Sequence, residues 1–305
     1  MSDRSRFLEG LEPLDVEETW PMLLGGRYRI VRPMGQGGYG RVFEAVDLLT
    51  EQTVAIKQLR PHGLSPATDR VRFLNEARTL EALENTVIVT LHDTANPDDE
   101  VPFFVMEFIE GETLAAYLRR RRYLSVREVF LIAARLLEGL AAVHEVGVVH
   151  RDIKPGNVVL KISDLGEISL KLLDFGLSGR FGIDPLPRVT KVGHVVGTPG
   201  YMAPEQLLGC TPDPRSDLFS LGITMYQALT AHRPFEPRKS ADLAEYVRRV
   251  TRTSPDPPSR LRPGLGEAVD DVILRALRRQ PAERYQDAAQ MRVACDGLLA
   301  RLPVF

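Results

Sequence analysis

Cysteine and long apolar runs are both scarce in this chain of 305 residues. The two cysteines, Cys210 and Cys295, lie far apart in dissimilar settings, which argues against a disulfide framework and a CxxC metal site. No run approaches the roughly 18 apolar residues of a membrane span, and the N-terminal sequence lacks the apolar core of a secretory signal. We therefore expect reduced thiols, no membrane segment in this chain and a cytoplasmic location.

Neither sign of charge dominates, because 39 basic residues face 41 acidic ones and the formal net charge is -2. This near-balance argues against a nucleic-acid partner, since proteins hold nucleic acids largely through contacts with phosphates. Lysine is rare, so the position of each lysine is informative. The six lysines are Lys57, Lys154, Lys161, Lys171, Lys191 and Lys239.

The first part of the chain is predicted to be rich in strands. Short, partly alternating runs bounded by turn residues are typical of antiparallel strands, and they occur at 28–31, 41–46, 53–57, 87–93 and 102–107. One helix is expected over residues 67–84. Its predicted apolar stripe consists of Val71, Leu74, Ala77, Leu80 and Leu83.

The remainder of the chain is predicted to be mainly helical. Helical patterns cover residues 113–122 and 126–145 and resume at Ser216, with short strands expected at 158–160 and 169–173 and a loop at 177–200. Residues 1–26 are acidic and weakly patterned, so we interpret them as an N-terminal extension whose Trp20 and Leu24 dock on the body. The predicted fold class is α+β, with a small antiparallel β lobe and one key helix over 27–107 and a larger helical lobe over 108–305.

A glycine-rich turn lies between the first two predicted strands and contains Gly35, Gln36, Gly37, Gly38, Tyr39 and Gly40. A GxGxxG pattern alone is weak, because a plain hairpin also uses glycine. A dinucleotide-binding loop would open a helix here, whereas this chain runs into a strand, and no GxxxxGK is present. The remaining functional reading is a glycine hairpin whose backbone N–H groups approach phosphates.

Lys57 ends the apolar strand that follows this turn, where an unpaired ammonium would be costly. Glu76 lies on the predicted helix, on a face expected to turn toward the sheet. A purely structural ion pair is one interpretation. The functional alternative is that Glu76 orients Lys57 to bind the α- and β-phosphates of a nucleotide.

The most specific segment runs from Val149 through His150-Arg151-Asp152-Ile153-Lys154-Pro155-Gly156 to Asn157, and Leu173-Asp174-Phe175-Gly176 follows downstream. With the glycine turn, Lys57 and Glu76 before it and Glu205, Asp217 and Arg284 after it, the chain resembles the protein kinase superfamily over roughly residues 27–300. The resemblance is strongest to bacterial, eukaryotic-like serine/threonine kinases. It implies a bilobal kinase fold that transfers the γ-phosphate of ATP to protein hydroxyls.

The resemblance assigns roles to residues at the matching positions. It implies that Asp152 orients or deprotonates the substrate hydroxyl, that Lys154 neutralises the γ-phosphate, and that Asn157 and Asp174 bind Mg²⁺. It also implies a nucleotide-binding set around the glycine turn and a hinge, with Met106 as the gatekeeper. That set comprises Met34, Gly35, Gln36, Gly37, Gly38, Tyr39, Gly40, Val42, Ala55, Lys57, Glu76, Met106, Glu107 and Phe108.

Lys154 and the segment from Gly197 to Glu205 fit the serine/threonine type, so the expected partners are protein substrates with serine or threonine acceptors. By resemblance, Thr198 contacts Asp152 and Lys154, and Tyr201 shapes the pocket for the residue after the acceptor. Glu205 is expected to pair with Arg284.

Control by phosphorylation is expected from Arg151, which could pair with a phosphate on the activation loop. Thr190 is the favoured acceptor and Thr198 a weaker one, and the alternative is that Thr190 is an ordinary loop residue. The same resemblance suggests autophosphorylation, signal transduction and pairing into a homodimer through the small lobe. Two other functional classes stay open at this point, a pseudokinase that only binds partners and a kinase of small molecules.

Overall fold

The computed structural model describes residues 22–36, 40–59, 66–95, 101–163, 167–175, 179–180, 198–237 and 243–303. The chain divides into two compact units, the first made of residues 1–116 with 156–176 and the second of 117–155 with 177–305. Among the residues so described, no helix combines the length and the apolar character needed to cross a bilayer.

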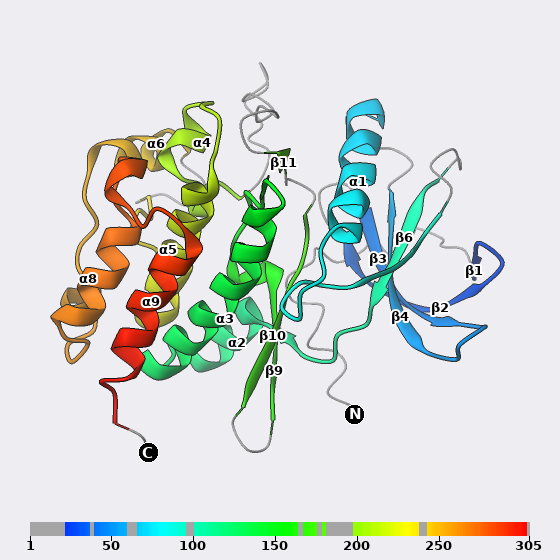
Figure 1. Cartoon of the computed structure of the whole chain (residues 1–305), viewed down its shortest axis with the longest axis horizontal. Helices are drawn as coiled ribbons and strands as arrows, with labels where there is room; N and C mark the ends of the chain where they lie inside the picture. The colour runs from blue at the N-terminus through cyan, green and yellow to red at the C-terminus, as the bar shows by residue number, and fades with distance from the viewer. Residues whose placement is uncertain are drawn as a thin grey trace. The chain divides into compact units, whose positions relative to one another are not determined.

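A six-stranded antiparallel sheet forms most of the first unit (Figure 1). The first part of β2 alternates between buried and exposed side chains, as a half-buried strand does, whereas β3 and β4 in the middle of the sheet are buried almost throughout. In spatial order they are β1 Leu23–Leu24, β2 Tyr28–Gln36, β3 Gly40–Asp47, β4 Thr53–Leu59, β6 Phe103–Glu107 and β5 Leu91–Thr94.

The predicted strand at 87–93 is wrong at its beginning, because β5 starts only at Leu91. The apolar residues before it are buried by a different neighbour. The Val89 amide donates to the Leu172 carbonyl at 3.3 Å, and the Leu172 amide donates to the Val87 carbonyl at 2.7 Å. Local alternation cannot distinguish pairing within the sheet from pairing with a segment far along the chain.

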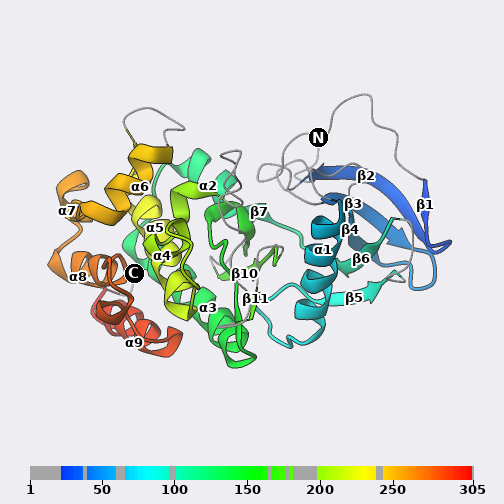
Figure 2. The same cartoon turned by 90° about the horizontal axis from the view of Figure 1, so that it is seen from above.

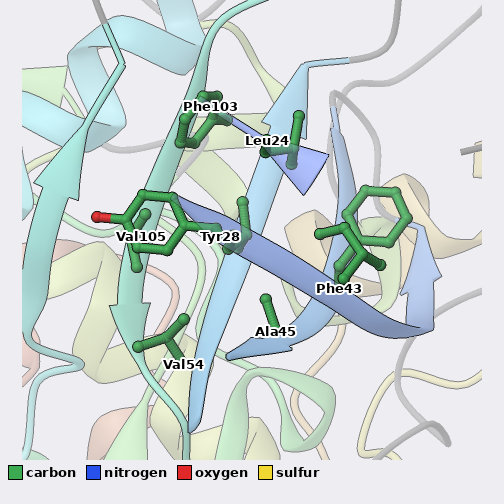
Figure 3. Close-up of a cluster of buried hydrophobic side chains, with 9 residues drawn as sticks. Leu24, Tyr28, Phe43, Ala45, Val54, Phe103 and Val105 are labelled. Carbon is green, nitrogen blue, oxygen red and sulfur yellow. The ribbon is translucent and has the colours of Figure 1, made fainter. Parts of the chain in front are cut away.

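One face of the sheet buries a compact apolar cluster (Figure 3). Phe43, Ala45 and Ile56 are fully buried in it, and Leu24 is 8% exposed, so the expected docking of Leu24 is confirmed. Trp20 lies outside the described residues. At about 25 cal/mol per Å² of apolar surface, such burial supplies the main favourable free energy of this unit.

Helix α1, Pro66–Glu81, packs against β4 and β5 of this sheet (Figure 2). The predicted stripe is partly wrong, because Val71 is 57% exposed whereas Phe73 is buried and packs against Phe104 with ring centroids 4.9 Å apart and the rings tilted by 41°. The buried face runs through Phe73, Ala77 and Leu80, at helical spacings of four and three. Glu76 therefore turns inward beside Ala77.

A second, three-stranded sheet in the first unit consists of β10 Ile168–Leu172, β9 Val158–Ile162 and β7 Glu112–Thr113. The β9–β10 hairpin agrees with the two short strands predicted there. Gly111 precedes β7, and a Cβ at that position would lie 2.3 Å from the Leu160 carbonyl oxygen. Only glycine permits this close approach of two backbones.

The second unit is mainly helical, as predicted (Figure 1). Helix α3, Val126–Glu145, has the predicted bounds, and a capping box between Ser125 and Glu128 fixes its start. It packs against α5, Pro214–Thr230, and α9, Ala288–Leu299, while α8, Glu267–Ala276, packs against both of these. The short strands β8 Val148–Val149 and β11 Gly179–Arg180 pair with each other.

The other elements are short. Helix α2, Leu114–Arg121, begins in the first unit and ends in the second. The remaining helices are α4 Pro204–Leu207, α6 Leu243–Arg252 and α7 Pro258–Leu261, with 3₁₀ turns at Pro155–Asn157, Pro199–Tyr201 and Pro281–Glu283. The predicted α+β fold class, an N-terminal antiparallel sheet with one helix followed by a mainly helical part, is confirmed.

Candidate active site

Lys57 is the centre of a buried ionic cluster in the first unit. Its Nζ lies 2.7 Å from both carboxylate oxygens of Glu76 and 2.9 Å from Oδ1 of Asp174. The Lys57 and Glu76 side chains are 9% and 3% exposed, whereas that of Asp174 is 40% exposed. The contact predicted between Lys57 and Glu76 is present, and the structure adds a third partner.

Burial and charge act on this cluster in opposite ways. Burial lowers the pKa of Lys57, but Asp174 and Glu76 outweigh it and hold the pKa above its usual range. Burial, reinforced by Asp174, raises the pKa of Glu76 to about 7 despite the attraction of Lys57. One ammonium thus faces two carboxylates, so Lys57 stays charged and Glu76 is the group that resists ionisation.

The glycine turn lies directly beside this cluster. A Cβ on Gly40 would lie 2.9 Å from the Gln58 carbonyl oxygen and 3.2 Å from Cγ of Lys57, so a side chain cannot fit there without a shift. Gly35 has φ 149, a conformation that favours glycine. Gly37, Gly38 and Tyr39 lie outside the described residues.

Apolar side chains gather next to the turn. Met34, Val42 and Val159 are buried together, and four partly buried residues pack against them. Ala55 is buried on β4 directly opposite Met106 on β6. The four partly buried residues are Met106, Phe108, Ile109 and Leu173.

The two expected metal ligands are close in the first unit. The Leu173 amide donates to the Asn157 carbonyl at 2.8 Å, which places Asn157 beside the residue that precedes Asp174. Asp174 has φ 62, a left-handed conformation that is costly for a residue with a side chain. Within the described part of the chain, no group of three His, Cys, Asp or Glu residues gathers for a metal, so Asn157 and Asp174 would need further oxygen ligands from a bound molecule.

In the second unit, Lys154 joins two residues that the sequence singled out. Its Nζ lies 2.6 Å from Oδ2 of Asp152 and donates to Oγ1 of Thr198 at 2.7 Å. Asp152 is 7% exposed and the Lys154 side chain is 22% exposed. Thr198 and Asp152 thus share one ammonium group, which agrees with the contact predicted between Thr198 and Lys154.

A buried aspartate fixes the backbone just before Asp152. Asp217 is fully buried on α5 and accepts hydrogen bonds from the amides of His150 at 2.9 Å and Arg151 at 2.8 Å. Arg151 has φ 68, and these two bonds help to hold it in that left-handed conformation. Burial opposes ionisation of Asp217, but the hydrogen bond and charge of His144, whose Nε2 lies 2.9 Å away, lower the pKa of Asp217 overall.

The segment after Thr198 is held by a second buried ion pair. Glu205 accepts from both terminal nitrogens of Arg284 at 2.7 and 2.8 Å, and the Arg284 side chain is fully buried. Ser216 also donates to Glu205 at 2.7 Å. The predicted pair of Glu205 with Arg284 is present and bidentate. With the Ser216 bond and a bond from Arg284 to the Arg215 carbonyl at 3.1 Å, it holds the start of α4 against the start of α5.

A model of the protein kinase domain matches residues 28–294 of the chain. The chain belongs to the protein kinase family. A probable serine/threonine-protein kinase of Streptomyces coelicolor is 35% identical over 288 residues, which cover 93% of this chain and 42% of that protein. The serine/threonine-protein kinase PknB of Mycobacterium tuberculosis is 34% identical over 278 residues, which cover 90% of this chain and 43% of PknB.

The kinase pkn3 of Myxococcus xanthus is 34% identical over 277 residues, covering 90% of this chain and 50% of pkn3, and its name also describes a serine/threonine-protein kinase. The chain therefore spans half or less of the length of these three relatives. The similarity concerns the kinase domain, and it includes both units described above.

An ion pair beside the hinge of this kinase domain was also missed in the sequence. The side chain of Glu107, a member of the expected nucleotide-binding set, accepts from the Thr90 amide at 2.7 Å and pairs with Lys171 on β10. Lys171 donates in turn to the Ile88 carbonyl at 3.0 Å. The rarity of lysine is the signal that could have found it, because Lys171 lies just before the Leu173-Asp174 pair.

Proposed function

We propose that this kinase domain transfers the γ-phosphoryl group of ATP to serine or threonine hydroxyls of proteins. The observation that carries the proposal is the position of Lys154, whose ammonium lies within hydrogen-bonding distance of both Asp152 and Thr198. These contacts support a site in which Asp152 acts as the base, Lys154 as the cation and Thr198 as the start of a peptide-binding segment. The serine/threonine names of the relatives support the same activity.

The first unit fits ATP in three respects. The apolar cluster of Met34, Val42 and Val159 matches a flat purine, which needs apolar contact on its faces. Glycines in the turn carry no side chain that would keep phosphates away from its backbone N–H groups, and Gly40 also packs too closely on Gln58 and Lys57 to accept one. Lys57 supplies the cation, and Glu76 keeps it in place. We assign Gly35, Gln36, Ala55, Met106, Glu107 and Phe108 to the same nucleotide site, together with Gly37, Gly38 and Tyr39.

Asn157 and Asp174 present the oxygen ligands that Mg²⁺ prefers, and 40% exposure leaves the Asp174 carboxylate accessible. When bound, Mg²⁺ would neutralise charge on the phosphate oxygens. Asp152 orients the substrate hydroxyl and accepts its proton, and Lys154 stabilises the negative charge that develops on the transferred group. Arg151 stays fixed through Asp217 and so keeps Asp152 in position.

Three finer features belong to this proposal. Thr190, outside the described residues, is the proposed autophosphorylation site. Two copies of the chain are proposed to pair through exposed leucines of the first unit, Leu48 at 49% and Leu49 at 75% exposure, which a partner would cover. A cytoplasmic location is proposed because ATP is available there and because Cys210 and Cys295 form no disulfide.

Thr190→Ala should abolish phosphate on the loop in mass spectra and lower transfer activity. Full activity of this variant, with no phosphate found in the wild-type loop, would contradict the assignment.

Pairing of two copies is tested by analytical sedimentation. The wild type should sediment as a dimer, and Leu49→Asp should dissociate that dimer. A wild type that remains a monomer at high concentration would contradict the proposed pairing.

The main test is Mg²⁺-dependent transfer of labelled γ-phosphate from ATP to the protein itself and to a generic protein substrate, with Asp152→Asn in parallel. We expect phosphoserine or phosphothreonine with the wild type and none with the variant. ATP binding without transfer by the wild type would instead indicate a pseudokinase. Labelling of small molecules but not of proteins would indicate a kinase of small molecules.

A further inference from the structure

Arg233 lies against the segment that follows Thr198 in the second unit. A Cβ on Gly200 would lie 2.0 Å from Nη1 of Arg233, so the guanidinium occupies the space that glycine leaves open. The guanidinium carbon is 6.0 Å from the centroid of the Tyr201 ring. Arg233 therefore borders the segment that begins at Thr198. Thr198 in turn shares the Lys154 ammonium with Asp152.

The charge of Arg233 is only partly offset by its neighbours. Glu236 lies 3.1 Å away, but the two side chains are 28% and 47% exposed, and an ion pair of this exposure is weak. The Tyr201 hydroxyl donates to Gln227 at 2.6 Å, and Gln227 carries no charge. A substrate carboxylate can therefore compete with Glu236 for the guanidinium.

The field of Arg233 reaches the groups around it. Burial raises the pKa of Tyr201 and of Tyr246, and Arg233 opposes the rise at both. Glu236 and Asp152 act on Tyr201 in the opposite sense. The Tyr246 hydroxyl donates to the Met202 carbonyl at 3.2 Å, so Tyr246 borders the same segment.

We infer that Arg233 is a specificity-determining residue that selects protein substrates with an acidic side chain close to the serine or threonine acceptor. The inference rests on the proposed function and names a substrate class for the same site. A guanidinium is always charged and its planar fork binds a carboxylate through two hydrogen bonds, which a neutral side chain cannot match. Neighbouring residues of an extended peptide are about 3.8 Å apart, so a flanking side chain can reach a group beside Tyr201.

A structural role is the competing explanation, because Arg233 also packs on Gly200 and Tyr201. If Arg233 only supported this segment, its substitution would change kcat/KM equally for all peptides. A specificity residue changes the ratio of kcat/KM between peptides that differ only in charge, and this ratio is therefore the decisive readout.

The experiment uses three peptides with one threonine acceptor that differ only in having Glu, Gln or Lys at a flanking position, moved through each position in turn. At the best position the wild type should prefer the Glu peptide over the Gln peptide by about tenfold in kcat/KM, the size of one charge-assisted hydrogen bond. Arg233→Gln should lower kcat/KM for the Glu peptide by about tenfold more than for the Gln peptide, and so remove this preference. Arg233→Glu should shift the preference to the Lys peptide.

Two further variants serve as controls. Glu236→Gln removes the competing carboxylate and should raise the preference for the Glu peptide. Arg233→Lys keeps the charge without the fork and should retain part of the preference, which gives a second test if Arg233→Gln unfolds in a thermal melt.

An equal loss for all peptides in Arg233→Gln, or a wild type that does not distinguish Glu from Gln at any position, would overturn the inference. Equal labelling of all peptides by the wild type would leave the proposed kinase activity intact. A lack of transfer to every peptide and to a generic protein would overturn both.

Discussion

The two units hold their functional lysines in contrasting environments. Lys57 is almost fully buried between two carboxylates, whereas Lys154 is more accessible and contacts one carboxylate and one hydroxyl. The first arrangement has an excess of negative charge that a metal ion or a further cation would relieve. The second leaves its lysine able to stabilise a group that arrives only during the reaction. We infer that the first unit serves nucleotide binding and the second serves transfer.

Lys57→Met should have the largest effect and tests the first half of this comparison. Removing the ammonium leaves Glu76 and Asp174 without their cation, and we expect a loss of about 3 kcal/mol in the free energy of unfolding at neutral pH. ATP binding should also be lost. Denaturant titrations of the variant and of Lys57→Arg, which keeps the charge, provide the measurement.

The pH dependence of that loss is a sharper test. Burial raises the pKa of Glu76 in the folded protein to about 7 from its ordinary 4.5. A carboxyl group with a raised folded-state pKa binds its proton more tightly in the folded state, so its protonation favours folding between these values. Lys57 lowers the pKa of Glu76, so its removal raises the pKa further and the variant takes up the Glu76 proton at a higher pH than the wild type does. The deficit of Lys57→Met should therefore shrink as the pH falls toward about 7 and change little just below it. A deficit that grows on acidification would contradict this account of the cluster.

Lys154→Met tests the inference that the second unit serves phosphate transfer. Removal of one charge that stabilises the transition state lowers kcat by about 100-fold, whereas ATP affinity should stay unchanged because Lys154 belongs to the transfer half. Steady-state kinetics with parallel ATP titrations separate the two effects, and Lys154→Arg is the charge-preserving control. Loss of ATP affinity without loss of kcat would reverse the assignment.

Asp217→Asn tests how the second unit keeps Asp152 in place. An amide replaces one of the two acceptor oxygens and leaves a buried amide donor unpaired, at a cost of about 2 kcal/mol in the free energy of unfolding. Because the pKa of Asp217 is lowered from 3.8, its contribution is present above that value and is lost as the pH falls further. The difference between wild type and variant should therefore shrink below about pH 3.8.

Denaturant titrations across this pH range check the prediction, with Asp271→Asn at an exposed position of α8 as the matched control. A difference between wild type and Asp217→Asn that does not change with pH would show that the charge of Asp217 contributes nothing to stability.

Lys171→Met should have the smallest effect. Its pair with Glu107 is partly exposed, at 20% and 26%, so we expect about 1 kcal/mol or less. Lys161→Met on the neighbouring strand is the matched control, because its pair with Glu110 is 61% and 72% exposed and should contribute almost nothing. Equal melting temperatures for the two variants would mean that the Glu107–Lys171 pair has no structural role.

The sequence predicted contacts where a physical need was visible in the residue itself. A lysine at the end of an apolar strand requires an anion, and this reasoning identified Glu76 correctly. Nothing local indicated that Lys57 would also contact Asp174, which lies 117 positions away. Arg233 was missed for a related reason, because a single arginine after a helix has no pattern and acquires meaning only from its contact with Gly200.

The errors about burial and strand bounds also arise from contacts with distant residues. Val71 was assigned to the buried stripe of α1 because it is apolar, yet Phe73 is the residue that meets Phe104. Val87 was assigned to a strand, yet it pairs with Leu172 from a distant part of the chain. In both cases the partner, rather than the local pattern, decides which residues are buried.

The most direct test of the contrast between the two units is a calorimetric titration of Asp152→Asn and Lys57→Met with ATP and Mg²⁺, beside an assay of phosphate transfer. Our account predicts that both variants fail to transfer, that Asp152→Asn binds ATP with wild-type affinity, and that Lys57→Met does not bind it. Loss of ATP binding in Asp152→Asn, or wild-type affinity in Lys57→Met, would contradict the division of labour between the two lysine environments.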